Sequence, residues 1–279
     1  MLSRLDDAVR LQPALEPAAA SLRALLAAMR AVVVHLPPDV PDLEVAAARL
    51  HGGVPALTGE PVSDGATLLA DLESMCARLR EEPGGRGAAT LGALSAVEGA
   101  LRTGRPRVDA DVLARAAAAG DWDEVLAAAP QLDVDEYALV AALDYAVRPA
   151  LRAAAARVTA LIADTRWERG ACPACGAPPL LAELHGKDAG RVLRCGRWAS
   201  AWSFPRVGCA ACGERDHRRL GALHREGEED YRRAEYCEQC RRYLKTVAVL
   251  DPLTPDGVIE EDLATAALDL AAVERGYHR

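Results

Sequence analysis

The sequence predicts an α plus small β fold: a helical N-terminal bundle, two small β modules in tandem and a C-terminal helix. Apolar residues recur at helical spacing through an alanine- and leucine-rich stretch at the N-terminus. Short β-type segments and seven of the eight cysteines follow between residues 167 and 245, and helical spacing then returns. We therefore expect four regions: 1–166, 167–208, 209–250 and 251–279.

The first region is expected to form antiparallel helices joined by short loops. A helix over 18–34 carries leucines along one face and should end at Pro37 and Pro38. The last helix of this region, from about 133 to 164, is long for a globular protein. Because proline removes a backbone donor, we expect Pro149 to kink or divide this helix.

The second and third regions are predicted to be rich in short strands. Glycines and charged residues separate β-type segments at 180–185, 191–195, 201–206, 218–224, 231–237 and 243–250. Two zinc-ribbon or rubredoxin-like modules fit this pattern, the first of them incomplete in its cysteines. The fourth region is predicted to form one helix over 258–275, ended by Gly276.

Four cysteines predict a metal site in the second module. Cys209 and Cys212 form one C-x-x-C pair, and Cys237 and Cys240 form another after a gap of 24 residues. A two-residue spacer lets a tight turn point two thiolates at one ion, and two such turns supply a tetrahedral ligand set. Four sulfur ligands suit iron or zinc, and the spacing does not choose between them.

The first module offers three cysteines. Cys172 and Cys175 form a C-x-x-C pair, but Trp198 stands where a second pair beginning at Cys195 would close. One interpretation is that the fourth ligand comes from elsewhere, such as His185, Glu183 or a water. An open fourth position of this kind is typical of catalytic metal sites. The other interpretation is that this site has lost its metal, and packing of Trp198 holds the module.

Composition limits the remaining possibilities. The chain has 279 residues and a net charge of −8, no run of 18 apolar residues and no signal-peptide pattern at its N-terminus, so a cytoplasmic location is expected. Thiols stay reduced there, which favours metal ligation over disulfides. We find no Ser-His-Asp set, phosphate-binding glycine loop or paired carboxylates, so the chain is not predicted to be an enzyme.

Nucleic-acid binding is the main alternative function. Four arginines lie close in sequence to three aromatic rings on which the bases of a single-stranded nucleic acid could stack. The arginines are Arg191, Arg194, Arg197 and Arg206, and the rings are Trp198, Trp202 and Phe204. However, residues 167–250 hold only 15 Lys and Arg against 11 Asp and Glu, a small excess for a nucleic-acid module. A thioredoxin-type role for the C-E-Q-C pair at 237–240 is disfavoured, because a strand-like segment follows it rather than a helix.

Several motifs together resemble the formate dehydrogenase accessory protein family, FdhE. W-x-x-G-x-C-P-x-C-G-x-x-P runs from 167 to 179, and R-V-x-C-x-x-C runs from 206 to 212. C-x-x-C-x-x-Y-L-K follows at 237–245, and D-L-A-T-x-A-L-D-L lies at 262–270. The resemblance covers residues 167–277, whereas the N-terminal half is similar only in being helical.

The resemblance implies a function. Members of this family are cytoplasmic maturation factors that bind the catalytic subunit of a molybdenum- or tungsten-dependent formate dehydrogenase, with iron bound in two rubredoxin-like modules. The family pattern contains four C-x-x-C pairs, and Trp198 interrupts the second. The motif positions Arg206, Tyr243 and Lys245 are candidates for contacts with the partner.

Overall fold

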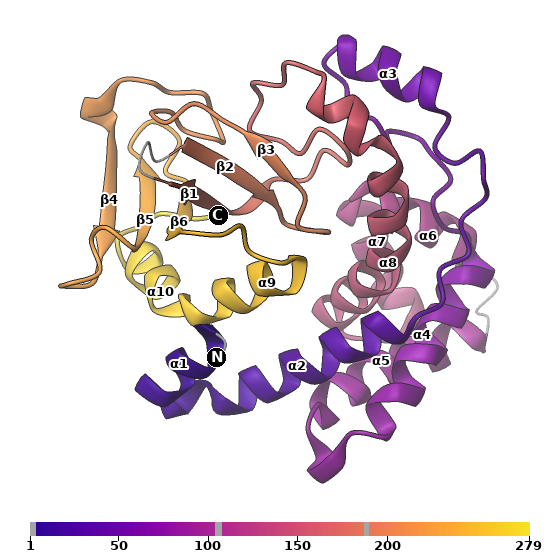
Figure 1. Ribbon diagram of the computed structural model, residues 1–279. Helices are drawn as coiled ribbons and strands as arrows, with labels where there is room; N and C mark the ends of the chain where they lie inside the picture. Colours follow the sequence, from indigo (N-terminus) through magenta and orange to yellow (C-terminus); the bar gives the residue numbers. More distant parts are fainter. Residues whose placement is uncertain (1–3, 104–107, 187–189) are drawn as a thin grey trace. The chain divides into compact units, whose positions relative to one another are not determined.

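The computed structural model describes residues 4–103, 108–186 and 190–279 (Figure 1). Its contacts divide the chain into two compact units that interleave along the sequence. A helical unit contains residues 14–47 and 56–159, and a sheet unit contains the residues up to 13, 48–55 and 160–279.

The helical unit is built around α4. Its helices are α2 (Glu16–Ala31), α4 (Gly65–Arg80), α5 (Ala88–Arg102), α6 (Ala110–Ala119), α7 (Trp122–Leu132) and most of α8 (Glu136–Ala163), and α3 (Leu43–His51) begins in it. Helix α4 packs against α2, α5 and α6. Leu68, Leu72, Met75 and Leu79 recur on its buried face at helical spacing, as the pattern of apolar residues predicts.

Helix α8 runs without interruption through Pro149, so the predicted division is wrong, whereas a kink at Pro149 stays a prediction. Buried residues recur on both sides of the proline, among them Leu143, Ala146, Ala150 and Ala154. The packing of this continuous small-residue face offsets the loss of one backbone hydrogen bond, which costs about 3 kcal/mol in an isolated helix.

The sheet unit is built on one six-stranded sheet in the order β3-β2-β1-β6-β5-β4. The strands are β1 (Pro179–His185), β2 (Gly190–Cys195), β3 (Ala201–Ser203), β4 (Leu220–His224), β5 (Arg232–Cys237) and β6 (Tyr243–Val249). Neighbouring strands pair antiparallel except β1 and β6, which pair parallel. Each predicted module thus supplies three strands to a shared sheet; whether the segments 167–208 and 209–250 are separate domains stays a prediction.

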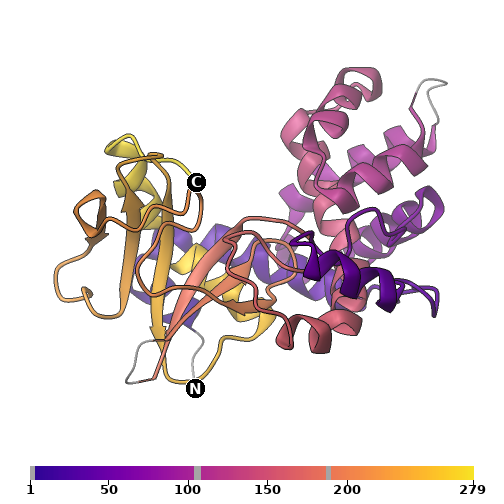
Figure 2. The same cartoon turned by 90° about the horizontal axis from the view of Figure 1, so that it is seen from above.

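Two helices follow the sheet where one was predicted. Helices α9 (Pro255–Ala264) and α10 (Ala266–Glu274) meet at Thr265, whose hydroxyl donates to the carbonyl oxygen of Glu261. Helix α10 packs on β4, β5 and β6, and α9 packs on β1 and on α1 (Arg4–Leu11) (Figures 1 and 2). The predicted order of helices, sheet and C-terminal helical segment is otherwise confirmed.

Candidate metal centres

The described residues contain four loops with the same backbone, which we call knuckles. In each, the N–H of the first cysteine donates to the carbonyl oxygen five residues later, at 2.8–2.9 Å. The N–H of the residue four positions after the cysteine donates back to the cysteine carbonyl, at 2.9–3.2 Å. The knuckles are residues 172–177, 195–200, 209–214 and 237–242.

The second knuckle is complete in its backbone although it lacks a second cysteine. The fifth residue of every knuckle has a left-handed backbone: Gly176 (φ 78°), Ala199 (φ 61°), Gly213 (φ 77°) and Arg241 (φ 58°). Glycine adopts this conformation without penalty, whereas other residues adopt it at a cost of roughly 1–2 kcal/mol. Loop 195–200 therefore keeps the backbone of a ligand-bearing turn with Trp198 in the position of the second cysteine.

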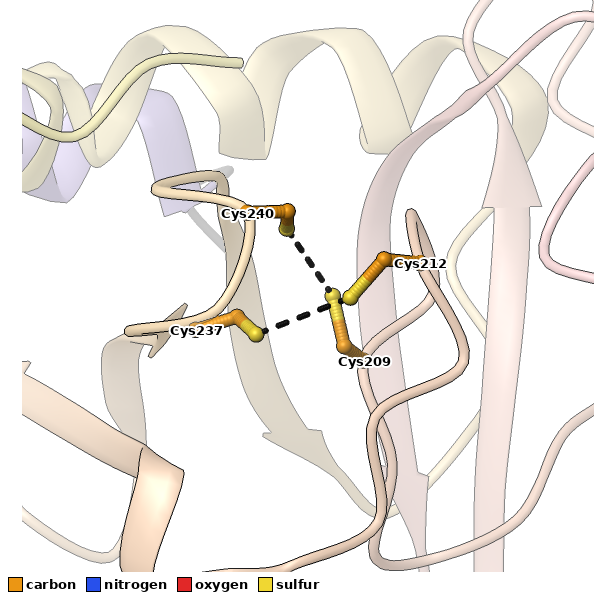
Figure 3. A group of neighbouring side chains, drawn as sticks. All are labelled: Cys209, Cys212, Cys237 and Cys240. Carbon is orange, nitrogen blue, oxygen red and sulfur yellow. Dashed lines mark hydrogen bonds between the residues drawn. The ribbon is translucent and has the colours of Figure 1, made fainter.

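The third and fourth knuckles bring four thiols together, as the spacing predicts (Figure 3). The sulfurs of Cys209, Cys212, Cys237 and Cys240 all lie within 4.8 Å of one another. Two of the distances between the knuckles are 3.6 Å, from Cys209 to Cys240, and 3.7 Å, from Cys212 to Cys237. A tetrahedron with metal–sulfur bonds of about 2.3 Å has edges of about 3.8 Å. The donor set fits a four-thiolate metal ion.

The surroundings of these thiols shift their pKa values in different directions. Burial raises the pKa of Cys209, and it raises that of Cys240 to about 12. Burial also opposes ionisation of the exposed Cys212, but the backbone N–H of Glu214 and the neighbouring thiols lower the pKa of Cys212. A cation bound here would replace thiol protons, so its binding would weaken as the pH falls.

The first and second knuckles bring three thiols together. The sulfurs of Cys172, Cys175 and Cys195 lie within 4.8 Å of one another, with 3.5 Å between Cys175 and Cys195. Burial alone would raise the pKa of Cys172, but hydrogen bonds from the other two thiols and from Ser200 lower it well below its usual range. The geometry fits three ligands of one metal ion.

The structure does not bring His185 or Glu183 to these thiols. Pro179 of β1 pairs with Cys195, whereas His185 pairs with Gly190 at the other end of the strand, about 20 Å away at the usual rise per residue. The His185 ring instead contacts the buried Glu183 carboxylate at 2.6 Å, and Arg194 also donates to that carboxylate. Both residues belong to a buried polar network rather than to the cluster.

The candidate partner residues lie in different environments. Lys245 is 1% exposed, and its Nζ lies 2.7 Å from a carboxylate oxygen of Asp262 and 2.7 Å from one of Asp269. The Tyr243 hydroxyl donates to Asp269 at 2.8 Å. These two side chains fasten the C-terminal helices to the sheet, so Lys245 is not available to a partner. The Arg206 side chain is 46% exposed.

This cluster of Lys245, Asp262 and Asp269 was not predicted from the sequence. A signal for it exists in strand alternation. Tyr243, Lys245 and Val247 fall on one face of β6, and that face is buried under α10 and α9.

Most of the arginines and rings considered for nucleic-acid binding are buried. Arg191, Arg194 and Arg197 are 4–7% exposed, Trp202 is 5% exposed and Trp198 is 8% exposed. Arg191 pairs with Glu235 at 2.9 Å, and Arg194 pairs with Glu183. These side chains therefore do not form the exposed stacking surface that nucleic-acid binding requires.

A groove of about 810 Å³ lies on the sheet between the first and third knuckles. Its lining includes Leu180, Ala222, Leu244 and the side chains of Arg191, Arg206 and Arg233. The guanidinium nitrogens of Arg191, Arg206 and Arg233 lie 2.9, 3.9 and 2.9 Å, in that order, from the carboxylate oxygens of Glu235. The groove thus combines apolar surface with excess positive charge.

Comparisons with known proteins agree with the motifs. The family described as "FdhE, C-terminal domain" matches residues 207–279. A protein named "Protein FdhE homolog" from Stutzerimonas stutzeri is 36% identical over 118 residues, which are 41% of this chain and 37% of that protein. A homologue of the same name from Pseudomonas aeruginosa is 37% identical over 117 residues, 40% of this chain and 38% of that protein. The matches thus span little more than a third of these relatives' length.

A solved structure extends the likeness to the whole chain. The crystal structure of the FdhE protein from Pseudomonas aeruginosa superposes with a TM-score of 0.68 at 26% sequence identity, covering 99% of this chain and 91% of that one. Among the residues that the structure describes, no helix is long and apolar enough to cross a membrane. Motifs, cysteine clusters and fold lead to one conclusion: the C-terminal part of the chain matches the FdhE family, and the whole chain shares the fold of an FdhE protein.

Proposed function

We propose that this chain is a non-enzymatic, cytoplasmic accessory factor that binds the catalytic subunit of a formate dehydrogenase and supports its assembly or activation. The observation that carries the proposal is the pair of cysteine clusters held by one shared sheet in a chain whose C-terminal part matches the FdhE family. The partner is inferred from the family resemblance.

The four-thiolate cluster favours a structural or electron-exchanging role over catalysis. Cys209, Cys212, Cys237 and Cys240 would fill all four positions of a tetrahedral ion, leaving none for a substrate. Iron held by these thiolates would supply one-electron exchange, whereas zinc would supply only cross-linking of the two knuckles. In both cases the cysteines hold the third and fourth knuckles at a fixed distance and so shape one wall of the groove.

The groove is the surface best suited to hold the partner. Arg206 is exposed, and the three arginines around Glu235 exceed its charge by two. Its apolar residues, Leu180, Ala222 and Leu244, suit an extended segment with alternating side chains. An acidic and apolar segment of the catalytic subunit is therefore the expected occupant.

The experiment measures binding of the purified metal-loaded protein to the catalytic subunit of a formate dehydrogenase, without air. Arg206→Glu should weaken binding at least about tenfold, because the groove then repels an acidic segment. Arg215→Glu is the matched control, since Arg215 is an exposed arginine nearby in the sequence that does not line the groove.

The outcomes separate the function from the surface. No binding by the unmodified protein would overturn the proposed function. Equal loss in the two variants would show a diffuse charge effect and remove the groove from the proposal, leaving the partner in place.

A further inference from the structure

The three-cysteine cluster has a fourth polar side chain at ligand distance. The hydroxyl oxygen of Ser200 lies 3.4 Å from the sulfur of Cys172. Metal bonds of about 2.3 Å to sulfur and about 2.0 Å to oxygen at a tetrahedral angle place those two atoms about 3.5 Å apart. The observed distance matches this edge.

The two clusters share a pattern of contacts that assigns a place to this hydroxyl. In the four-cysteine cluster, the first cysteine of each knuckle contacts the second cysteine of the other knuckle, at 3.6 and 3.7 Å. In the three-cysteine cluster, Cys195 contacts Cys175 in the same sense, at 3.5 Å. Cys172 makes its corresponding contact with Ser200. The serine therefore stands where the pattern requires the missing cysteine.

Trp198 cannot take this role. Its indole is 8% exposed and its Nε1 is a hydrogen-bond donor, which has no lone pair to offer a cation. Within the described part of the chain, this buried Nε1 has no hydrogen-bond partner. The tryptophan fills space in the knuckle, while the backbone hydrogen bond from the N–H of Cys195 to the carbonyl oxygen of Ser200, at 2.8 Å, holds the serine beside the cluster.

We infer that Ser200 supplies the fourth ligand of the first cluster, so that this chain holds a second metal ion through three thiolates and one hydroxyl oxygen. The first site then carries one thiolate charge fewer than the second and includes a harder donor. It should bind a thiophilic ion such as Zn²⁺ more weakly than the second site does. This inference concerns metal binding alone and does not depend on the proposed partner.

The test loads the full-length protein with Co²⁺ without air and measures metal content, the absorption from sulfur-to-cobalt charge transfer, and release to a competing chelator. The unmodified protein should bind two equivalents, one of them released more readily. In Ser200→Ala, the more readily released equivalent should be lost to the chelator at least about tenfold more readily, as expected for the loss of a ligand. Release of the second equivalent should be unchanged. Ser203→Ala, which changes an exposed serine on the adjacent strand β3, should match the unmodified protein.

A gain-of-ligand variant keeps the test decisive if Ser200→Ala folds poorly. Ser200→Cys should keep two equivalents, increase the charge-transfer absorption from that of seven thiolates to that of eight, and slow release of the weaker ion. In a Trp198→Cys background, which restores the cysteine position, Ser200→Ala should no longer affect release. One equivalent in the unmodified protein, or equal release by the unmodified protein and a folded Ser200→Ala variant, would overturn the inference.

Discussion

The two cysteine clusters share a backbone and differ in one residue of their ligand sets. Both are built from two knuckles that repeat the same hydrogen bonds and the same left-handed residue. The second cluster has four cysteines, and the first has three with Trp198 in the remaining position. The fold therefore holds the geometry of the site, and single side chains decide which atoms occupy it.

The difference extends to how each half of the sheet is fastened. Strand β6 carries Lys245, which is held by Asp262 and Asp269, and strand β1 carries Glu183, which is held by Arg194. Both central side chains are buried, at 1% and 0% exposure. Because β1 and β6 are neighbours, the two halves of the sheet meet at two strands that each carry a buried ionic anchor.

The largest expected effect is the loss of the four-cysteine site. Cys237→Ala should remove its metal and lower the free energy of unfolding by several kcal/mol, since structural zinc sites in peptides contribute about 10–16 kcal/mol of apparent binding free energy. Cys195→Ala should cost less, because it removes a ligand from the weaker site. Thermal unfolding of both variants, with and without a chelator, makes the measurement. Equal destabilisation by the two changes would contradict the ranking of the sites.

The ionic anchor of the second half should give the next largest effect. Lys245→Met should lower the free energy of unfolding by about 3 kcal/mol, because it removes the buried partner of Asp262 and Asp269 and leaves them only the more exposed Arg279 as a cation. Arg218→Met is the control, since that arginine pairs with Asp216 on the surface, where solvent screens the pair and its contribution is small. Chemical denaturation at neutral pH compares them, and a Lys245→Met variant as stable as its parent would show that the anchor contributes little.

A smaller effect is expected where the segment just before the first knuckle touches the third knuckle. A Cβ at Gly170 would overlap the carbonyl oxygen of Ala210, so the two segments must separate to accept Gly170→Ala. We expect a loss of about 2–3 kcal/mol, as for overpacking in a core. Gly213→Ala is the matched control: its φ of 77° disfavours alanine by roughly 1 kcal/mol, but no atom lies within 4 Å of the added carbon. Equal losses in thermal unfolding would mean that the loops yield freely.

Sequence patterns predicted the parts of this molecule that depend on local chemistry. The spacing of Cys209, Cys212, Cys237 and Cys240 predicted their cluster, because a C-x-x-C turn fixes both thiols within a few residues. Strand alternation placed β1 and β6 within one residue of their observed ends. Both signals are short in range.

The remaining features depend on long-range contacts. Ser200 reaches Cys172 only because the second knuckle survives without its second cysteine, and a left-handed Ala199 leaves no mark in the sequence. The parallel pairing of β1 with β6 joins segments some sixty residues apart. His185 lies between Cys175 and Cys195 in sequence, yet the extended strand carries it away from both.

The smallest expected effect concerns a buried carboxyl group of the helical unit, in contrast to the paired buried charges of the sheet unit. Asp71 of α4 is 7% exposed, and burial raises its pKa to about 7 despite the opposing influence of the exposed His35. Since the unfolded pKa is near 3.8, the folded protein retains a proton that the unfolded chain loses between these two values. Stability should therefore fall as the pH rises through this window, and the loss is complete above about pH 7.

The Asp71→Asn variant tests whether stability falls as the pH rises. Relative to its parent, the variant should gain about 1–2 kcal/mol between pH 5.5 and pH 8, because asparagine carries no proton to lose. Asp64→Asn is the control: hydrogen bonds from Thr67 lower the pKa of Asp64, so its contribution changes only in acid and its effect should be equal at the two pH values. Denaturant unfolding at constant metal loading provides the measurement. A constant difference between Asp71→Asn and its parent would show that the folded protein holds Asp71 ionised throughout.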